Sequence, residues 1–334
     1  MGKSDLTMCL AGDAFMTRML NSIVAAAVMA FGAASNAEVI SRLEMVSGDR
    51  QIAVGTLTPA KPFVLRATSA NGTPVVGARL FIGPAADPGF PYVQDQFGYR
   101  GFNTVGIVQY GGVGSPSPQY FAVTDTTGQV SGQGQYVDPA PSAFVVAAGQ
   151  VDEHRATQTL FTVVAVKALP PGRPSVVVEY FHADLRHYFN TLLDAEVAAL
   201  DAGVFAGWQR SVGAFIAYPS KADAPADAVP VCRFFSSKFT SHFYTADPAE
   251  CAFVVDNWPD VWQLETTSAF YVSVPDRQTG QCPTGQQPVY RLFNNLPSPN
   301  HRYVTDLKLR NTMVGSGWIA EGYGPNAVMF CTPA

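Results

Sequence analysis

The chain has 334 residues, of which 47% are hydrophobic and 14% are charged, and its formal net charge is -5. The apolar fraction excludes a wholly disordered chain, and the length suggests about two domains. Because 21 Lys and Arg residues face 26 Asp and Glu residues and form no basic block, the sequence argues against nucleic acid as a partner. The 29 Gly and 25 Pro residues favour short strands joined by tight turns.

The N-terminus has the pattern of a secretory signal. Arg18 precedes the apolar run Ile23–Phe31, and the small residues Ser35-Asn36-Ala37 follow. The apolar run is shorter than the ~20 residues that a membrane-spanning helix needs, although a retained membrane anchor is the alternative. We therefore expect residues 1–37 to be an export signal, with residues 1–15 as an upstream extension, and no membrane span after its removal.

The cysteines agree with export. Removing Cys9 with the signal leaves four cysteines, which are Cys232, Cys251, Cys282 and Cys331. An even number in one half of the chain indicates two disulfides formed in an oxidising compartment. The closely spaced C-x-x-C pairs that are typical of zinc sites are missing from the sequence. Four cysteines allow three different pairings.

Residues 38–169 consist of alternating apolar segments broken by turn residues. The strand-like runs are Phe63–Thr68, Val75–Ile82, Tyr120–Val123, Ala143–Ala148 and Thr159–Val166. Between the first two runs, Asn71-Gly72 is a strong turn or hairpin signal. Strands at this spacing, without helical periodicity, predict an antiparallel β-sandwich.

Two short motifs add a family resemblance to this prediction. Asn71–Ala78 reads N-G-T-P-V-V-G-A, and Thr124–Gly128 reads T-D-T-T-G. With these motifs, residues 38–169 resemble the bacterial immunoglobulin-like domains of the invasin and intimin kind. Residues 83–117, which are rich in glycine, proline and aromatic residues, depart from the pattern of that family. The resemblance implies an immunoglobulin-like sandwich.

The chain repeats itself beyond the linker Leu169–Pro174. We define segment 1 as residues 177–229, segment 2 as residues 230–287 and segment 3 as residues 288–334. Each segment contains a β-like run, a second run with a histidine, and a later tryptophan. The histidines are His187, His242 and His301, and the tryptophans are Trp208, Trp262 and Trp318. Both markers recur at nearly equal spacing, which indicates three copies of one unit.

Each segment is also predicted to contain one short helix, preceded by an aspartate that can cap its N-terminus. The aspartates are Asp194, Asp247 and Asp306, and the helices are Ala195–Ala202, Pro248–Val255 and Leu307–Val314. Because one segment cannot bury its aromatic face alone, we expect the three to close around a pseudo-threefold axis. The predicted fold is therefore mainly β, with an immunoglobulin-like sandwich at residues 38–169 and a propeller-like or trefoil-like repeat domain at residues 170–334.

The repeat selects one of the three cysteine pairings. Cys232 and Cys251 lie close together within segment 2, whereas Cys282 shortly precedes the first run of segment 3 and Cys331 ends that segment. We therefore predict the disulfides Cys232–Cys251 and Cys282–Cys331. The shorter of the two loops would stabilise the fold by ~3 kcal/mol in the chain-entropy description.

Three motifs in the C-terminal half resemble a known family. Tyr290–Asn294 reads Y-R-L-F-N, His242–Asp247 reads H-F-Y-T-A-D, and Trp318–Gly324 reads W-I-A-E-G-Y-G. With these motifs, residues 170–334 resemble the secreted bacterial repeat family called domain of unknown function 5648. The resemblance implies a secreted accessory domain without an established activity.

The sequence contains no pattern of a catalytic site. It has no G-x-S-x-G motif, no carboxylate pair at a recognisable catalytic spacing, and no glycine-rich phosphate loop between a strand and a helix. We therefore expect no enzymatic activity and no cofactor. If the segments share an axis, His187, His242 and His301 could converge there and bind a metal such as zinc. The alternative, which we favour, is that each histidine packs and bonds to a neighbouring segment.

Aromatic side chains are the remaining candidates for ligand contacts. Three tryptophans could stack on sugar faces, although one tryptophan at a fixed place in each repeat is more often a core residue. They are Trp208, Trp262 and Trp318. Tyrosines that we expect to be partly exposed are equally good candidates, and they are Tyr180, Tyr244 and Tyr303.

These observations predict an exported, non-catalytic binding or adhesion protein that is secreted, periplasmic or on the cell surface. The repeat domain would recognise a surface ligand such as a glycan, and the sandwich would serve as a spacer or adhesive stalk. Two alternatives stay open. One is a purely structural protein of the cell envelope, and the other is a hydrolase with a site at the axis of the repeats.

Overall fold

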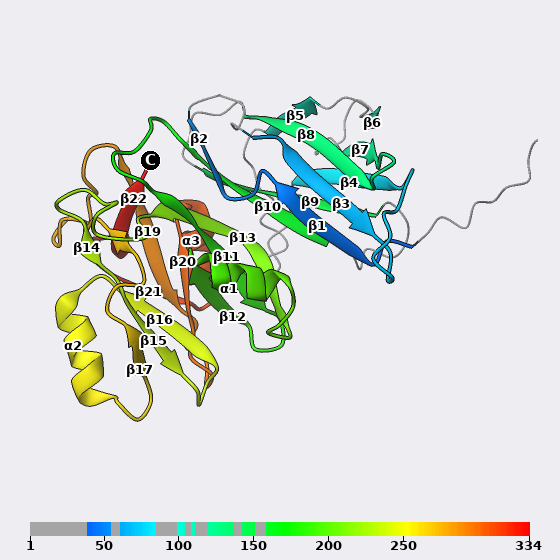
Figure 1. The fold of residues 1–334 in the computed structure, drawn as a ribbon. Helices are drawn as coiled ribbons and strands as arrows, with labels where there is room; N and C mark the ends of the chain where they lie inside the picture. Colours follow the sequence, from blue (N-terminus) through cyan, green and yellow to red (C-terminus); the bar gives the residue numbers. More distant parts are fainter. Residues whose placement is uncertain are drawn as a thin grey trace, which may run out of the picture. The chain divides into compact units, whose positions relative to one another are not determined.

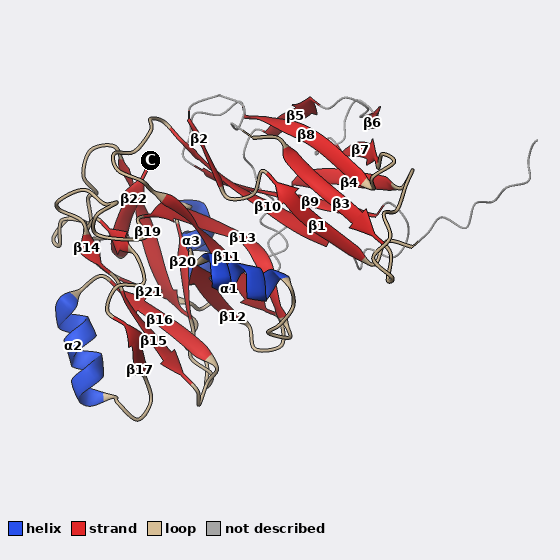
Figure 2. Ribbon diagram, viewed as in Figure 1, coloured by secondary structure: helices blue, strands red, loops and turns tan. Residues whose placement is uncertain are grey.

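The computed structural model describes residues 39–54, 61–84, 99–103, 108–110, 119–136, 142–150 and 158–334. In this part the chain is mainly β, with several open sheets and short helices (Figures 1 and 2), so the predicted fold class is confirmed at this level. No helix in the described ranges is both long and apolar enough to cross a membrane. The export signal predicted over residues 1–37 lies outside the described residues.

Two sheets form the N-terminal part. The first has the order β1 (Arg42–Ser47), β3 (Phe63–Thr68), β8 (Gln129–Tyr136) and β5 (Tyr99–Asn103). The second has the order β2 (Gln51–Val54), β10 (Gln158–Val166), β9 (Ser142–Gln150), β4 (Arg79–Pro84), β7 (Gln119–Val123) and β6 (Val108–Tyr110). Neighbouring strands in both sheets run antiparallel, except that β2 and β10 are parallel.

The two sheets share one apolar core. Along β3 every second residue is buried, which is the pattern of a strand with one face on a core. Leu65 of the first sheet and Val163 of the second belong to the same buried cluster. The Phe63 ring lies against Phe161, with 4.9 Å between the ring centroids. The immunoglobulin-like type of this part stays a prediction.

The Asn71-Gly72 pair forms a turn, but the strands on either side of it lie in different sheets. The Gly72 N–H donates to the Ser69 carbonyl at 2.9 Å, and Gly72 has a φ of 83°, which favours glycine. The predicted strand Val75–Ile82 is wrong in its first half, since β4 begins only at its fifth residue. The physical reason is Gly77, whose φ of 72° breaks the extended backbone.

The order strand, strand, helix, strand occurs three times in the C-terminal half. Segment 1 contains β11 (Ser175–His182), β12 (His187–Thr191), α1 (Asp194–Asp201) and β13 (Trp208–Ala217). Segment 2 contains β15 (Cys232–Ser236), β16 (Ser241–Thr245), α2 (Pro248–Asn257) and β17 (Gln263–Thr266). Segment 3 contains β19 (Gln286–Phe293), β20 (His301–Val304), α3 (Leu307–Gly315) and β21 (Ile319–Glu321).

In each segment the first strand is the central one and pairs antiparallel with the other two. Two further strand pairs are β14 (Val229–Pro230) with β18 (Tyr271–Val272), and β22 (Val328–Pro333) with β19. None of the sheets in the described ranges closes on itself. The propeller-like or trefoil-like arrangement therefore stays a prediction.

The three predicted helices are confirmed to within two residues at their ends. Asp247 accepts a hydrogen bond from Ala249 N at 2.9 Å, and Asp306 caps α3 in the same manner. The predicted cap Asp194 is wrong, because it is already the first helical residue and the cap position holds Leu193. In all three segments the cap is the second residue after the strand, and in segment 1 that residue is not an aspartate.

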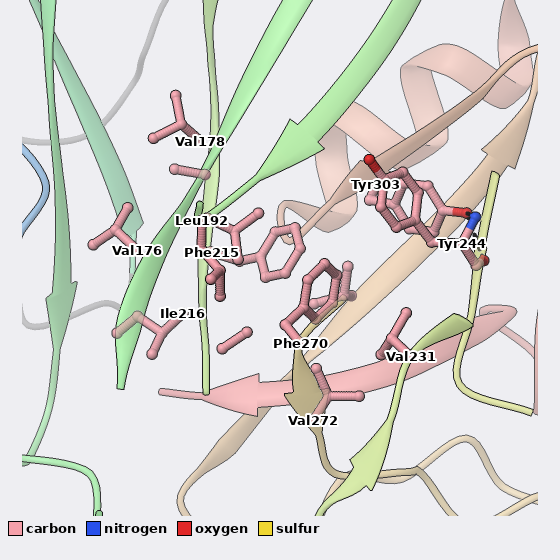
Figure 3. Close-up of a cluster of buried hydrophobic side chains, with 14 of the residues drawn as sticks. Val176, Val178, Leu192, Phe215, Ile216, Val231, Tyr244, Phe270, Val272 and Tyr303 are labelled. Carbon is pink, nitrogen blue, oxygen red and sulfur yellow. Dashed lines mark hydrogen bonds between the residues drawn. The ribbon is translucent and has the colours of Figure 1, made fainter. Parts of the chain in front are cut away.

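A core of apolar side chains joins the three segments (Figure 3). Within it, three phenylalanine rings contact one another, one from each segment, and they are Phe215, Phe270 and Phe330. Their ring centroids are 5.6 to 6.2 Å apart, and none of the three side chains is more than 1% exposed. Because each aromatic ring is covered by rings of the other two segments, no segment can bury its own ring alone.

Both predicted disulfides are confirmed. Cys232–Cys251 connects β15 to α2, and Cys282–Cys331 connects the residues before β19 to β22. The two bonds therefore add covalent links between residues that are 19 and 49 positions apart in the chain. Disulfides of this kind are typical of proteins in oxidising compartments.

Strand β10 contributes to two cores at once. Val163 and Ala165 belong to the core between the first two sheets, whereas Val164 and Val166 belong to the core of the three segments. Alternate residues of a strand point to opposite faces, so one strand can serve both. The predicted domain boundary at residue 170 is not tested by this arrangement, but apolar contacts continue across it.

A buried arginine reinforces this connection. Arg210 on β13 has a side chain only 4% exposed, and its guanidinium lies 2.8 Å from Asp49 and 2.6 Å from Asp201. Asp49 lies between β1 and β2, so the ion pair links the first two sheets to segment 1. Burial of a guanidinium is tolerated because both carboxylates compensate its charge.

We expect Arg210→Met to lower the free energy of unfolding by ~3–5 kcal/mol, because it leaves two carboxylates without their buried partner. The control is Arg173→Met, since Arg173 is 83% exposed and lies 2.7 Å from Asp223, away from Asp49 and Asp201. The control should cost ~0–1 kcal/mol. Urea unfolding with the disulfides intact measures both values, and equal losses would contradict the structural role of Arg210.

Candidate functional site

Partly buried charges connect segments 1 and 2. Arg233 on β15 donates to the two carboxylate oxygens of Glu196 on α1 at 3.0 and 2.8 Å. The same guanidinium lies 2.9 Å from Glu265 and 5.6 Å from the ring centroid of Phe189. The planar guanidinium thus has carboxylates at its edge and an aromatic ring at its face, an arrangement that suits arginine and not lysine.

Segments 2 and 3 meet in the same way. Arg291 on β19 donates to both carboxylate oxygens of Glu250 on α2 at 2.8 Å and lies 2.9 Å from Glu321. It lies 5.0 Å from the ring centroid of Phe243. The Arg291 side chain is only 5% exposed. In both junctions the arginine of one segment therefore binds the helix of the preceding segment.

At the junction between segments 3 and 1, a glutamate takes the place that arginine has at the other two junctions, and an arginine is its partner. Glu179 holds the place on β11 that arginine holds in the other segments, and it pairs with Arg302 of β20 at 2.8 Å. Both side chains are 0% exposed. Ser211, which stands where segment 3 has Glu321, donates its hydroxyl hydrogen to Glu179. A second carboxylate at this position would repel Glu179, so the serine fits the exchanged charge.

Two tyrosine hydroxyls connect the second strands of neighbouring segments. Tyr244 donates to the Asn190 carbonyl at 2.6 Å, and Tyr303 donates to the Tyr244 carbonyl at 2.7 Å. Asn190 holds the corresponding place in segment 1, where it is 2% exposed. Its side-chain amide makes no hydrogen bond to the described residues. The tyrosine contact is therefore made at two junctions and not at the third.

The expected exposure of the candidate tyrosines is wrong. Tyr180, Tyr244 and Tyr303 are 0%, 1% and 2% exposed, and burial raises the pKa of all three phenols. The Tyr180 hydroxyl donates to Asp201 at 2.9 Å. The side chains bond to partners in other elements and do not point toward solvent. The alternation of residues along one strand does not indicate which distant residues are these partners.

The structure does not place the three histidines at equivalent positions. In their strand pairs His242 and His301 lie opposite a phenylalanine, whereas His187 lies opposite His182. The residue that corresponds to His242 and His301 is Tyr188, one position later. The predicted equivalence of the histidines is therefore wrong by one residue, because spacing along the chain does not determine strand register.

His187 is fully buried and bonds to both other segments. Its Nδ1 lies 3.0 Å from the Thr240 carbonyl oxygen, and its Nε2 lies 3.0 Å from the Ser298 hydroxyl. Burial lowers the pKa of His187, and the hydrogen bonds to the two backbone carbonyls oppose this effect only in part. The ring is therefore neutral near pH 7 and holds loops of segments 2 and 3 together.

The other two histidines pair with carboxylates. His242 Nε2 lies 3.4 Å from Glu265, and His301 Nε2 lies 3.2 Å from Glu321. Burial lowers the pKa of His301, whereas the pKa of Glu321 is low because the bond from His301 and the charge of Arg291 outweigh burial. Across the part of the chain that is described, no group of three His, Cys, Asp or Glu side chains could hold a metal ion.

The three candidate tryptophans are half-buried. Trp208 packs against the core that the three segments share, whereas Trp262 and Trp318 pack against smaller clusters in segments 2 and 3. They make edge-to-face or tilted contacts with His182, Phe243 and Tyr188 respectively, with 5.4 to 6.2 Å between ring centroids. Each tryptophan is therefore only partly buried.

The sequence analysis missed the fourth tryptophan. Trp258 directly follows α2, is 49% exposed, and lies beside Phe253, which is 50% exposed. Their ring centroids are 5.3 Å apart. The sequence did offer one indication, because Trp258 lies outside the position at which tryptophan recurs in the segments. A residue that the other two segments lack is not needed for their fold.

We expect Tyr244→Phe and Tyr303→Phe each to lower the free energy of unfolding by ~1–2 kcal/mol, since each leaves a buried carbonyl without its donor. Asn190→Leu is the matched variant at the third position and should be neutral or stabilising, because its amide has no hydrogen bond to lose. Urea denaturation of the three variants measures this difference. A loss for Asn190→Leu as large as that for the tyrosines would contradict the assignment.

Stability should fall as the pH is lowered from 7.5 to 5.5. The pKa values of His187 and His301 are lowered in the folded chain, so the unfolded chain binds more protons near pH 6 and unfolding becomes easier. Glu321, with a lowered pKa, keeps its contribution until more acidic pH. In His187→Asn, which copies Asn300 of segment 3, the pH dependence should be weaker. An unchanged slope of unfolding free energy against pH would contradict this.

Comparison with known families identifies the C-terminal half. One family model matches residues 161–273 and again residues 187–328, and the two matches together span half of the chain. None of the curated proteins matches the chain. The two overlapping matches include all residues of the three junctions described above. The chain therefore belongs to the family described as domain of unknown function (DUF5648), in agreement with the resemblance of its sequence motifs.

Proposed function

We propose that the protein is an exported, non-catalytic binding or adhesion protein whose C-terminal half recognises a glycan on a surface. The observation that carries this proposal is the division of roles among side chains. Charged side chains such as Arg233, Arg291 and Arg302 are engaged in contacts between the segments, whereas Trp208, Trp262 and Trp318 are only partly buried. Accessible aromatic rings are suited to stacking on sugars.

The proposed arrangement is three copies of one unit around a pseudo-threefold axis. It is supported by the recurrent order of elements and by the mutual contact of Phe215, Phe270 and Phe330. Such an arrangement would present one tryptophan per copy, and several weak sites on one molecule raise the overall affinity for a polymeric surface. The N-terminal part would act as an immunoglobulin-like spacer, which its common core of two sheets supports.

Export is supported by the two disulfides, which persist in oxidising compartments. The first alternative, a purely structural protein of the cell envelope, is supported by the buried ion pairs, because they give rigidity and need no ligand. The second alternative is a hydrolase with its site at the axis. The packed phenylalanine rings at the meeting point of the segments speak against it.

The test uses the whole chain from residue 38, because the apolar core continues across residue 170. The purified protein is applied to an array of glycans and peptidoglycan fragments. We expect binding that becomes weaker in Trp208→Ala, Trp262→Ala and Trp318→Ala and is unchanged in Leu169→Ala, a 73% exposed apolar residue of the linker. Absence of binding to every probe would overturn the proposal and favour the structural alternative.

A further inference from the structure

The pair Phe253 and Trp258 on α2 is the most exposed contact between two aromatic rings in the described residues. About half of each side chain is exposed, and the planes of the rings lie at 89° to each other. The core-facing residues of α2 are Cys251 and Val254, whereas Phe253 on the helix and Trp258 at its C-terminal cap are exposed. Two exposed aromatic rings in contact offer an apolar surface on which a ligand can pack.

The other two helices show that the fold does not need these rings. Counted from the N-cap residue of each helix, Phe253 corresponds to Ala199 of α1 and Thr312 of α3. Both helices pack on their segments with a small or polar residue at this place. The aromatic pair is therefore a property of segment 2 alone, added to a unit that folds without it.

The rings sit on a rigid support. The disulfide Cys232–Cys251 ties α2 to β15. The Trp258 N–H donates to the Val254 carbonyl at 3.0 Å, and the Trp258 carbonyl accepts from Trp262 N at 2.9 Å. Because the backbone on both sides of the indole is held, a ligand would lose little free energy in ordering it.

The charges around the pair select the chemistry of the ligand. Glu250 of the helix is paired with Arg291, whereas Asp256 on the helix and Asp260 shortly after it are exposed, and the helix itself carries no lysine or arginine. Exposed carboxylates disfavour phosphates, uronates and sialates as ligands. A ligand with an apolar C–H face and many hydroxyl groups fits, since its face can stack on the indole and its hydroxyls can donate to the carboxylates and to the exposed amide of Asn257.

We propose that Phe253 and Trp258 form a binding platform for an uncharged glycan. This inference rests on the proposed function and narrows it in two respects, the place of the sugar contact and the charge of the sugar. Phe253 holds the indole by an edge-to-face contact, and Trp258 provides the surface on which the sugar ring stacks.

The experiment uses the whole chain from residue 38 and titrates it with the uncharged oligosaccharide that binds best on the array, with indole fluorescence as the readout. We expect Trp258→Ala and Phe253→Thr to lower the affinity about tenfold. Phe253→Thr copies Thr312 of α3 and should fold normally. The control is Val204→Ala, at an apolar position of segment 1 that is 68% exposed, which should bind like the unaltered chain.

The outcomes separate this inference from the broader proposal. If the chain binds glycans but both α2 variants bind equally well, the platform is overturned and the proposed function stands. Binding restricted to sialylated or uronate-containing glycans would also overturn the platform. If the unaltered chain binds no glycan, both are overturned. An unchanged thermal transition of Phe253→Thr together with its loss of affinity supports the platform.

Discussion

The arrangement of the C-terminal half depends on one buried ion pair, Glu179 with Arg302. The two residues come from segments 1 and 3, which are far apart in the chain, and neither side chain is exposed. A single charge in such surroundings would cost several kcal/mol, so each residue is tolerable only when the other is in place. The same contact brings β11 and β20 together and lets Phe215 reach the rings of the other two segments. Closing this junction is therefore the step on which the burial of the common core depends.

The exchange of charge at this junction also determines which segments can meet. Arg233 and Arg291 bind glutamates on the helix of the preceding segment, whereas segment 1 presents Glu179 at the same place. Segment 1 could not dock on a helix that offers a glutamate, because two carboxylates would face each other in a buried site. In segment 3 the helix offers Leu309 in place of that glutamate, and β20 supplies Arg302 instead. The signs of these charges therefore favour the observed order of the segments.

The two halves of the chain are joined by the alternation of β10 and by Arg210. Odd-numbered residues such as Val163 face one core and even-numbered residues such as Val164 face the other. Arg210 compensates Asp49 and Asp201 together, so removing either half would leave charge buried or apolar surface exposed. The proline-rich linker Leu169–Pro174 follows β10 in the chain. The apolar and ionic contacts between the two halves are made by residues outside this linker. Trp258 is exposed at the end of α2, and the three repeated tryptophans are only partly buried.

The sequence by itself determined the strands with clear alternation, the three helices, the disulfide pairing and the family of the C-terminal half. These features depend on residues close in the chain or on a repeated spacing, as with Pro248 at the start of a helix and the two cysteine pairs. Only the tertiary structure decided the strand register, in which His187 lies one position away from the place of His242 and His301. Because successive side chains of a strand point to opposite faces of the sheet, a shift of one residue in the register moves each side chain to the other face. The tertiary structure also decided the partners of Glu179, Tyr244 and Arg302. Each partner lies in another segment, and the sequence shows that a side chain is charged or polar without showing which distant residue it contacts.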